Sequence, residues 1–306
     1  MKKVSIVLPC YNGAETIERA VQGVINQTYR PIQLVLVNDG SIDQTDELIR
    51  SMEKKLDEAF IELKYVSQEN KGLGGAVNEG LKHVTGEYLA WVDADDELLP
   101  ESVEIRVNFL EKHPQYGSVS SNAMLVEERD WNHALSLATD NIQLNSEENQ
   151  FEHILLARSL FCAGCHLIRT SVFERANGGM DIYPARHGQN WQMLLPVYYA
   201  SKHAFLNIPL YKYRVDANSM EASARKMSAK KLAQRRWEHA KIIKYTLNRI
   251  VGMTNAERRK YMRMYVRRIF EQNLDTALVQ QDKAEIFKWR MVVRCMNRIP
   301  WWKRAS

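Results

Sequence analysis

Three aspartates crowd the chain directly after a short apolar segment. Asp93, Asp95 and Asp96 follow residues 88–92, which have the apolar composition of a buried strand. Carboxylates this close repel one another unless a cation lies among them. Side chains alternate along an extended chain, so Asp93 and Asp95 offer two oxygen ligands on one side to Mg²⁺ or Mn²⁺. The alternative is that these acids cap a helix that begins near Glu97, where the helix dipole favours them.

Segments typical of strands and of helices alternate through the first hundred residues. This alternation predicts an α/β domain with a mostly parallel mixed sheet and helices on both faces. The expected strands cover residues 4–8, 33–37, 63–66 and 88–92, and the expected helices cover residues 14–27, 43–56 and 72–84. Beyond residue 120 the pattern is weaker and predicts helices over residues 151–160 and 191–200, a strand over 165–168 and an edge strand over 205–213.

Polar residues also follow the first two expected strands. Tyr11 and Asn12 come just after Pro9, where we expect the first strand to stop, and Asp39 lies in an Asn-Asp-Gly-Ser turn after the second. The carboxyl ends of parallel strands line one crevice, so these residues should meet the aspartates there. Tyr11 could stack on a planar base, and Asp39 could accept a hydrogen bond from a base or ribose. Asn-Asp-Gly-Ser is also ordinary turn chemistry.

Glycines open the third expected helix, in the sequence Asn-Lys-Gly-Leu-Gly-Gly that starts at Asn70. Glycine lets the backbone approach a ligand closely, and the amides at a helix start favour phosphate. The run does not match the dinucleotide-binding pattern, because Val77 occupies the position of its last glycine. It indicates a phosphate loop only in combination with the other polar groups.

In their order along the chain, these segments resemble the signatures of the inverting family 2 glycosyltransferases of the GT-A fold. The opening strand with its Pro-Cys-Tyr-Asn ending, the Asn-Asp-Gly-Ser turn and the Asp-x-Asp group match three signatures. The glycine-opened helix matches another, with Val77 in place of a frequent arginine. The resemblance covers residues 3–115 and extends more faintly to about residue 215. It implies transfer of a sugar from a nucleotide-diphosphate donor to a glycan or lipid-linked acceptor, in bacterial surface-polysaccharide synthesis.

The resemblance also implies roles for individual residues. Asp95 would hold a Mg²⁺ or Mn²⁺ ion that bridges the diphosphate and stabilises the leaving group, and Asp93 would meet the ribose or the metal. Asp39 would hydrogen-bond the base. The residues expected around the nucleotide sugar are Pro9, Tyr11, Asn12, Asp39, Asn70, Gly74, Asn78, Asp93 and Ala94.

The position at which the family carries its catalytic base differs in this chain. Inverting members usually take the base from a Glu-Asp-Trp motif, but here the motif reads Gln189-Asn190-Trp191. Amides can orient an acceptor hydroxyl but cannot take its proton. Either His187 or Asp181 is the base, the acceptor is itself acidic, or the chain binds donor without efficient transfer. Histidine suits the role because its imidazole is largely neutral at neutral pH.

Gln189, Asn190 and Trp191 remain the expected acceptor-binding residues. Trp191 is either a platform for an acceptor sugar or a core residue. A nucleotidyltransferase would share the α/β layout, but it would place a basic, glycine-rich loop directly after the first strand. Cys162 and Cys165, followed by a histidine, could hold zinc, yet a structural zinc site needs a second ligand pair that the sequence lacks. We interpret these cysteines as structural.

Charge divides the chain into two parts. Residues 1–219 hold 20 Lys and Arg against 30 Asp and Glu, whereas residues 220–306 hold 22 against 7. We therefore expect a GT-A domain over 1–219, with a nucleotide-binding half over about 1–115 and an acceptor half over about 116–219. The basic region over 220–306 is expected to be helical, with a break near Gly252 and a stop at Pro300.

The basic region mixes its cations with aromatic residues and ends in Trp-Trp-Lys-Arg at residues 301–304. Such a mixture suits an anionic membrane surface. A solvated face or an oligomer contact is the alternative. Nucleic acid is disfavoured by the acidic first part and by the lack of a nucleic-acid-binding motif. No signal peptide and no run of about 18 apolar residues is present, so we expect a cytoplasmic protein, peripheral on the inner face of the plasma membrane.

Overall fold

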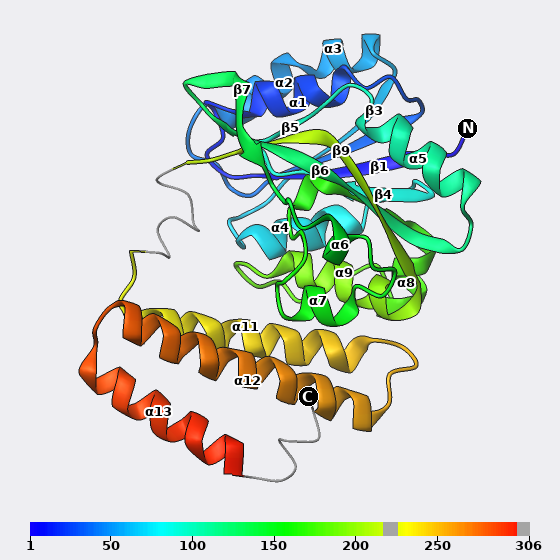
Figure 1. The fold of residues 1–306 in the computed structure, drawn as a ribbon. Helices are drawn as coiled ribbons and strands as arrows, with labels where there is room; N and C mark the ends of the chain where they lie inside the picture. The colour runs from blue at the N-terminus through cyan, green and yellow to red at the C-terminus, as the bar shows by residue number, and fades with distance from the viewer. Residues whose placement is uncertain (217–225, 299–306) are drawn as a thin grey trace. The chain divides into compact units, whose positions relative to one another are not determined.

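The computed structural model describes residues 1–216 and 226–298, and it divides into two compact units, Met1–Val215 and Asp216–Ser306 (Figure 1). The boundary expected between residues 219 and 220 lies within 217–225, outside the described residues. Among the helices that the structure describes, none is both long and apolar enough to span a bilayer.

The first unit is built on a mixed sheet, which has nine strands within the described residues. Their order is β3-β2-β1-β4-β8-β6-β9-β5, and β7 pairs with β6 alone. The first four are parallel, and the antiparallel β8 joins them to β6. The strands are β1 Val4–Cys10, β2 Ile32–Asn38, β3 Ile61–Ser67, β4 Tyr88–Trp91, β5 Glu97–Leu98, β6 Tyr116–Glu127, β7 Asp130–Leu137, β8 His166–Arg169 and β9 Lys202–Arg214.

Helices cover both faces of this sheet, with α1, α2 and α3 on one side and α4 and α9 on the other (Figure 1). The predicted α/β class is therefore confirmed. The expected single helix over residues 43–56 is wrong, because two shorter helices, α2 and α3, occupy this region. Between them the backbone makes a tighter turn, in which the N–H of Met52 donates to the carbonyl of Ile49. The helices of this unit are α1 Ile17–Ile25, α2 Thr45–Ser51, α3 Glu53–Glu58, α4 Leu73–Leu81, α5 Ser102–Lys112, α6 Ile142–Asn145, α7 Phe151–Leu155, the 3₁₀ turn η1 Ala163–Cys165, α8 Thr170–Asn177 and α9 Gln189–Ala200.

The first strand runs further than the sequence indicated. β1 continues through Pro9 and Cys10, so the expectation that Pro9 ends it is wrong. Pairing with β4 ends at Val7 and Trp91, whereas pairing with β2 continues to Cys10. Val7 accepts a hydrogen bond from Val92 on the β4 side. Pro9, two residues on, turns its missing N–H to that same side, so the ladder with β2 is undisturbed.

The second unit contains three helices over residues 226–298: α11 Ala229–Arg249, α12 Asn255–Val279 and α13 Lys283–Arg298. The break expected near Gly252 is confirmed, and Thr254 then starts α12 with a capping box to Glu257. A second break, at Gln281 with φ +56°, was not expected from the sequence. The stop at Pro300 and the Trp-Trp-Lys-Arg segment lie outside the described residues.

Two buried histidines lie within the core of the first unit. His203 in β9 contacts the hydroxyls of Ser118 and Ser120, each at 2.9 Å. His166 in β8 stacks on Trp91 with ring planes 8° apart. Burial, with the nearby charge of an arginine, lowers the pKa of His166 from 6.5 to about 3, and burial lowers the pKa of His203 well below 6.5. Both rings are therefore neutral in the folded protein.

We expect acid to destabilise this core. Below about pH 6.5 these histidines bind protons in the unfolded chain but stay neutral in the folded one. As the pH is lowered, the free energy of unfolding therefore falls by about 1.4 kcal/mol per pH unit for each histidine. Chemical denaturation at several pH values between about 7.5 and 5.5 measures the slope. His203→Gln should be less stable at neutral pH but should show a shallower slope. An unchanged slope would contradict the assignment.

Candidate active site

The loops that follow the parallel strands meet at one edge of the sheet. Cys10 pairs with Asn38, and Asn38 in turn pairs with Ser67, while Val7 pairs with Trp91. The residues after each strand end therefore lie side by side, as expected for a parallel sheet. This edge brings together residues 11–12, 39–41, 68–72 and 93–96.

Asn12 joins the first two of these loops. Its backbone adopts a positive φ of 50°, and its N–H donates to the hydroxyl of Ser41 at 2.9 Å. Its side-chain oxygen accepts from the N–H of Ile42 at 3.0 Å. Tyr11 beside it is 51% exposed, so its ring is accessible at this edge.

Asp39 is buried and shapes the loop before α4. Its carboxylate accepts hydrogen bonds from the Gln68 amide at 2.6 Å, from the N–H of Lys71 at 2.9 Å and from the N–H of Gly72 at 2.8 Å. Hydrogen bonds to a carboxylate are among the stronger ones in proteins. Asp39 thus has a structural task in addition to the base contact that remains a prediction for it.

This task can be tested on stability. In Asp39→Ala the amides of Lys71 and Gly72 lose their buried acceptor, so the free energy of unfolding should fall by about 2–3 kcal/mol. Denaturant unfolding measures it, with the exposed Asp57→Ala as the matched control. An Asp39 that served only to bind a base would leave stability unchanged.

The glycines at the start of α4 make room for another part of the chain. A Cβ on Gly72 would lie 2.9 Å from the Cα of Arg186, and one on Gly74 would lie 2.3 Å from the carbonyl oxygen of Ala185. We expected from the sequence that a ligand approaches the backbone closely here. In the structure the chain itself packs against these glycines, and the donor contact of Gly74 stays a prediction.

The segment that packs there is anchored by side chains on both neighbouring helices. The side-chain oxygen of Asn78 in α4 accepts from the N–H of Ile182 at 2.7 Å. The amide of Gln192 in α9 bonds both the N–H and the carbonyl of Tyr183, at 2.7 and 3.0 Å. Asn78, which was expected to contact the donor, therefore holds this segment in place.

The two expected bases lie at different ends of this segment. Asp181 lies near the end of α8, where its carbonyl accepts from Asn177 at 2.7 Å. His187 follows Arg186, which packs on Gly72, and is partly buried. His187 thus directly follows the residue that packs on the start of α4, whereas Asp181 lies near the end of α8.

The amide of Asn190 is engaged at both ends. Its oxygen accepts from the indole N–H of Trp91 at 2.9 Å, and its nitrogen donates to the carbonyl of Phe161 at 3.0 Å. An aspartate could accept the first bond but could not donate the second. The need for both a donor and an acceptor explains why an amide fits here. The bond to Trp91 also fixes the start of α9 against the end of β4, two residues before Asp93.

The other two residues of this motif are buried, whereas Asn190 is partly exposed. Gln189 starts α9, and Trp191 donates its indole N–H to the carbonyl of Ile154 at 2.9 Å. The Trp191 ring packs against Phe161, with centroids 4.8 Å apart. These contacts favour the core alternative for Trp191, and the acceptor roles of the motif remain predictions.

The aspartates after β4 divide into two kinds. Asp96 is fully buried and accepts from the Tyr211 hydroxyl at 2.7 Å and from the N–H of Arg214 at 2.8 Å. Burial and the charges of Asp95 and Asp93 raise its pKa well above the usual range. Asp93 and Asp95 are only partly buried. Asp96 therefore anchors the turn to β9, and the other two carboxylates line the edge.

The alternative that these acids cap a helix is wrong. The turn leads into β5, and α5 begins only at Ser102. Within residues 1–216 and 226–298, no group of three or more His, Cys, Asp or Glu side chains could enclose a metal ion by itself. Two carboxylates nevertheless suit a hard cation that completes its shell with phosphate and water.

The cysteine pair after α7 lies at the 3₁₀ turn η1, and its structural interpretation stays a prediction. A hydrogen bond with Cys165, together with burial, raises the pKa of Cys162 well above 9.0. The Cys162 thiol is therefore protonated in the folded chain.

Arg19 is a residue of this region that the sequence analysis missed. Its guanidinium donates to the carbonyl of Asp95 at 3.1 Å and to both carboxylate oxygens of Glu128, at 2.6 and 3.0 Å. It also lies over the ring of Trp131, 3.5 Å from the centroid. Glu128 and Trp131 belong to the β6–β7 hairpin, so Arg19 connects that hairpin to the Asp-x-Asp turn.

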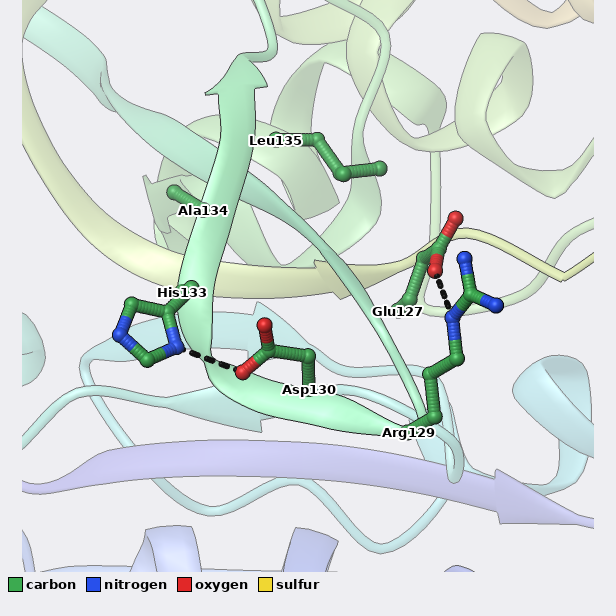
Figure 2. Close-up of a pocket in the computed structure, with 6 residues that line it drawn as sticks. All are labelled: Glu127, Arg129, Asp130, His133, Ala134 and Leu135. Atoms are coloured by element: carbon green, nitrogen blue, oxygen red, sulfur yellow. Dashed lines mark hydrogen bonds and ion pairs between the residues drawn. The ribbon is translucent and has the colours of Figure 1, made fainter.

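A separate pocket lies on the β6–β7 hairpin itself (Figure 2). Its charged residues form pairs, Arg129 with Glu127 and His133 with Asp130 at 2.6 Å. None of the residues expected to bind donor, metal or acceptor lines it. The residues that line it are Glu127, Arg129, Asp130, His133, Ala134 and Leu135.

Comparison with known proteins decides the family. The model of the family named Glycosyl transferase family 2 matches residues 5–176. The chain belongs to glycosyltransferase family 2. An uncharacterized glycosyltransferase of Rickettsia typhi is 31% identical over 179 residues, which are 58% of this chain and 53% of that protein. The chain thus spans about half the length of this relative.

Other similar proteins have named activities or ligands. The poly-beta-1,6-N-acetyl-D-glucosamine synthase of Staphylococcus epidermidis is 32% identical over 119 residues, 39% of this chain and 28% of that protein. The crystal structure of S. aureus TarS 1-349 in complex with UDP-GlcNAc has a TM-score of 0.67 at 18% identity, and the alignment covers 99% of this chain and 81% of that one. A mannosyltransferase from Pyrobaculum calidifontis in complex with GDP-Man and Mn²⁺ has a TM-score of 0.55 at 17% identity, with 99% and 83% covered. These similarities confirm the GT-A fold of this glycosyltransferase.

Proposed function

We propose that this family 2 enzyme transfers a sugar from a nucleotide-diphosphate donor to a glycan or lipid-linked acceptor in surface-polysaccharide synthesis. The observation that carries the proposal is the convergence of Tyr11, Asp39 and the partly buried Asp93 and Asp95 at one sheet edge. An exposed ring and buried polar loops suit a nucleotide there. The donors in the similar TarS and mannosyltransferase structures are nucleotide sugars.

Asp93 and Asp95 fit a divalent cation. Their carboxylates come from one turn, and their charges act on Asp96 strongly enough to help raise its pKa. Mg²⁺ or Mn²⁺ held there would stabilise the leaving nucleoside diphosphate as a Lewis acid. Arg19 holds the carbonyl of Asp95, and Asp96 anchors the turn, so the two ligands are preorganised.

His187 is the residue we propose as the base. It lies between Arg186, which packs on the start of α4, and Asn190, which bonds the end of β4. A base must come within about 3 Å of the acceptor hydroxyl, and this position adjoins the donor edge. Asp181 is the alternative, held near the end of α8. The engaged amide of Asn190 also supports a second candidate, a donor-binding subunit without efficient transfer.

We further propose that the enzyme works at the inner face of the plasma membrane. The second unit carries 19 Lys and Arg against 6 Asp and Glu over residues 226–298. Such an excess is attracted to anionic lipid, at about 1 kcal/mol per well-placed charge. An oligomer contact through these helices is the alternative.

Metal-dependent nucleotide binding and protein stability should distinguish the role of Asp95 from that of Asp96. Asp95→Ala should abolish Mn²⁺-dependent binding of UDP or GDP without loss of thermal stability. Asp96→Ala should lower the free energy of unfolding by about 1–3 kcal/mol, because Tyr211 and Arg214 lose a buried acceptor. Calorimetric titration and thermal unfolding measure both, with the exposed Asp140→Ala as control. Unchanged metal-dependent affinity in Asp95→Ala would overturn the metal proposal.

The base can be identified from transfer rates. His187→Ala should reduce turnover by about 10²–10⁴ while nucleotide affinity stays within error, because removal of a general base affects proton transfer alone. Asp181→Asn serves as the comparison and should cost less. Initial rates are measured with a panel of lipid-linked and glycan acceptors. Full turnover in His187→Ala would exclude it as the base, and a wild type that binds donor but transfers to no acceptor would favour the donor-binding subunit.

A further inference from the structure

Helix α13 is apolar on two faces, and only one of them is packed. Trp289 and Met296 are buried, and Trp289 clusters with Ala229, Ala233 and Ala277 of α11 and α12. On the other face Phe287 is 69% and Met291 is 54% exposed. A solvated helix face would carry polar side chains at these positions.

The exposed apolar residues of α13 form a stripe. Ala284, Phe287, Met291 and Cys295 are all exposed and follow one another at spacings of three and four residues. Residues at these spacings share one face of a helix. Val279, the last residue of α12, is 83% exposed as well. The stripe therefore runs the length of the described helix.

Cations border the stripe. Lys283, Lys288, Arg290 and Arg294 are exposed on either side of it. The acid of this helix, Glu285, is engaged by the ammonium of Lys288 at 3.0 Å and by the indole N–H of Trp289 at 2.6 Å. The face thus combines an apolar centre with a positive rim.

We propose that this face of α13, the stripe of residues 284, 287, 291 and 295 with its basic rim, docks on an anionic lipid bilayer. A bilayer offers an apolar layer beneath a layer of phosphates, which matches an apolar stripe between arginines. Nucleic acid would bind the cations but would leave Phe287 and Met291 in water. A second copy of the helix would set its arginines against those of the first.

This inference rests on the proposed location at a membrane and specifies which surface makes the contact. It is independent of the donor site, since Tyr11, Asp39 and Asp95 all belong to the first unit. Donor binding and lipid binding can therefore be measured on the same samples and can fail separately.

The experiment is co-sedimentation of the full chain with vesicles at low salt. One set contains phosphatidylglycerol and phosphatidylcholine, and the other contains phosphatidylcholine alone. The double variant Phe287→Ser/Met291→Ser should lose at least about tenfold in binding to the anionic set, because two apolar side chains no longer enter the lipid. Arg290→Gln/Arg294→Gln should lose a similar factor on that set. Phe60→Ser, which changes a phenylalanine 83% exposed on the first unit, is the matched control and should bind like the wild type.

Two controls keep the outcome decisive. Circular dichroism and calorimetric titration with UDP or GDP show that each variant keeps its helices and its donor site. Equal vesicle binding of the wild type and Phe287→Ser/Met291→Ser would overturn the proposal. A wild type that binds nucleotide but does not sediment with anionic vesicles would also overturn it. A wild-type dimer that the double variant converts to monomer would assign the face to a second copy instead.

Discussion

The buried carboxylate of Asp39 is the contact on which the edge at the ends of the parallel strands depends. It gathers the N–H groups of Lys71 and Gly72 and so fixes how the chain enters α4. The segment around Arg186 packs against the glycines of that entry, and His187 is the next residue along the chain. A negative charge withdrawn from water at the end of β2 thereby positions a residue more than a hundred places further along the chain. Fold and site share one hydrogen-bond network.

The aspartates after β4 show how one short sequence serves two purposes. Asp96 is buried and accepts hydrogen bonds from Tyr211 and Arg214, and these bonds fix the turn. Asp93 and Asp95 keep part of their surface at the edge, where a cation could reach them. Their mutual repulsion is tolerated because the turn is fixed from outside, by Asp96 on one side and by Arg19 on the other.

The parts of the fold that local pattern determines could be predicted from the sequence. The parallel strands β1, β2 and β4 are buried and mostly apolar, and the loops that follow them carry the polar residues of the candidate site. The long strand β6 escaped detection because it buries Ser118, Ser120 and Asn122, which hide the apolar pattern of a strand. Without β6 and its hairpin, the partners of Arg19 could not be foreseen, since Glu128 lies 109 residues away. The break at Gln281 carries neither glycine nor proline and left no signal.

The two-sided hydrogen bonding of Asn190 bears on how this sequence can evolve. Asn190→Asp would restore the acid of the common family motif, yet it would leave the carbonyl of Phe161 without its donor, at a cost of about 1 kcal/mol or more. It would also place a charge next to the buried indole of Trp91. A return to the acidic form of the motif therefore costs stability unless the contact at Phe161 changes with it. In the amide form both neighbours of Asn190 keep their hydrogen-bond partner.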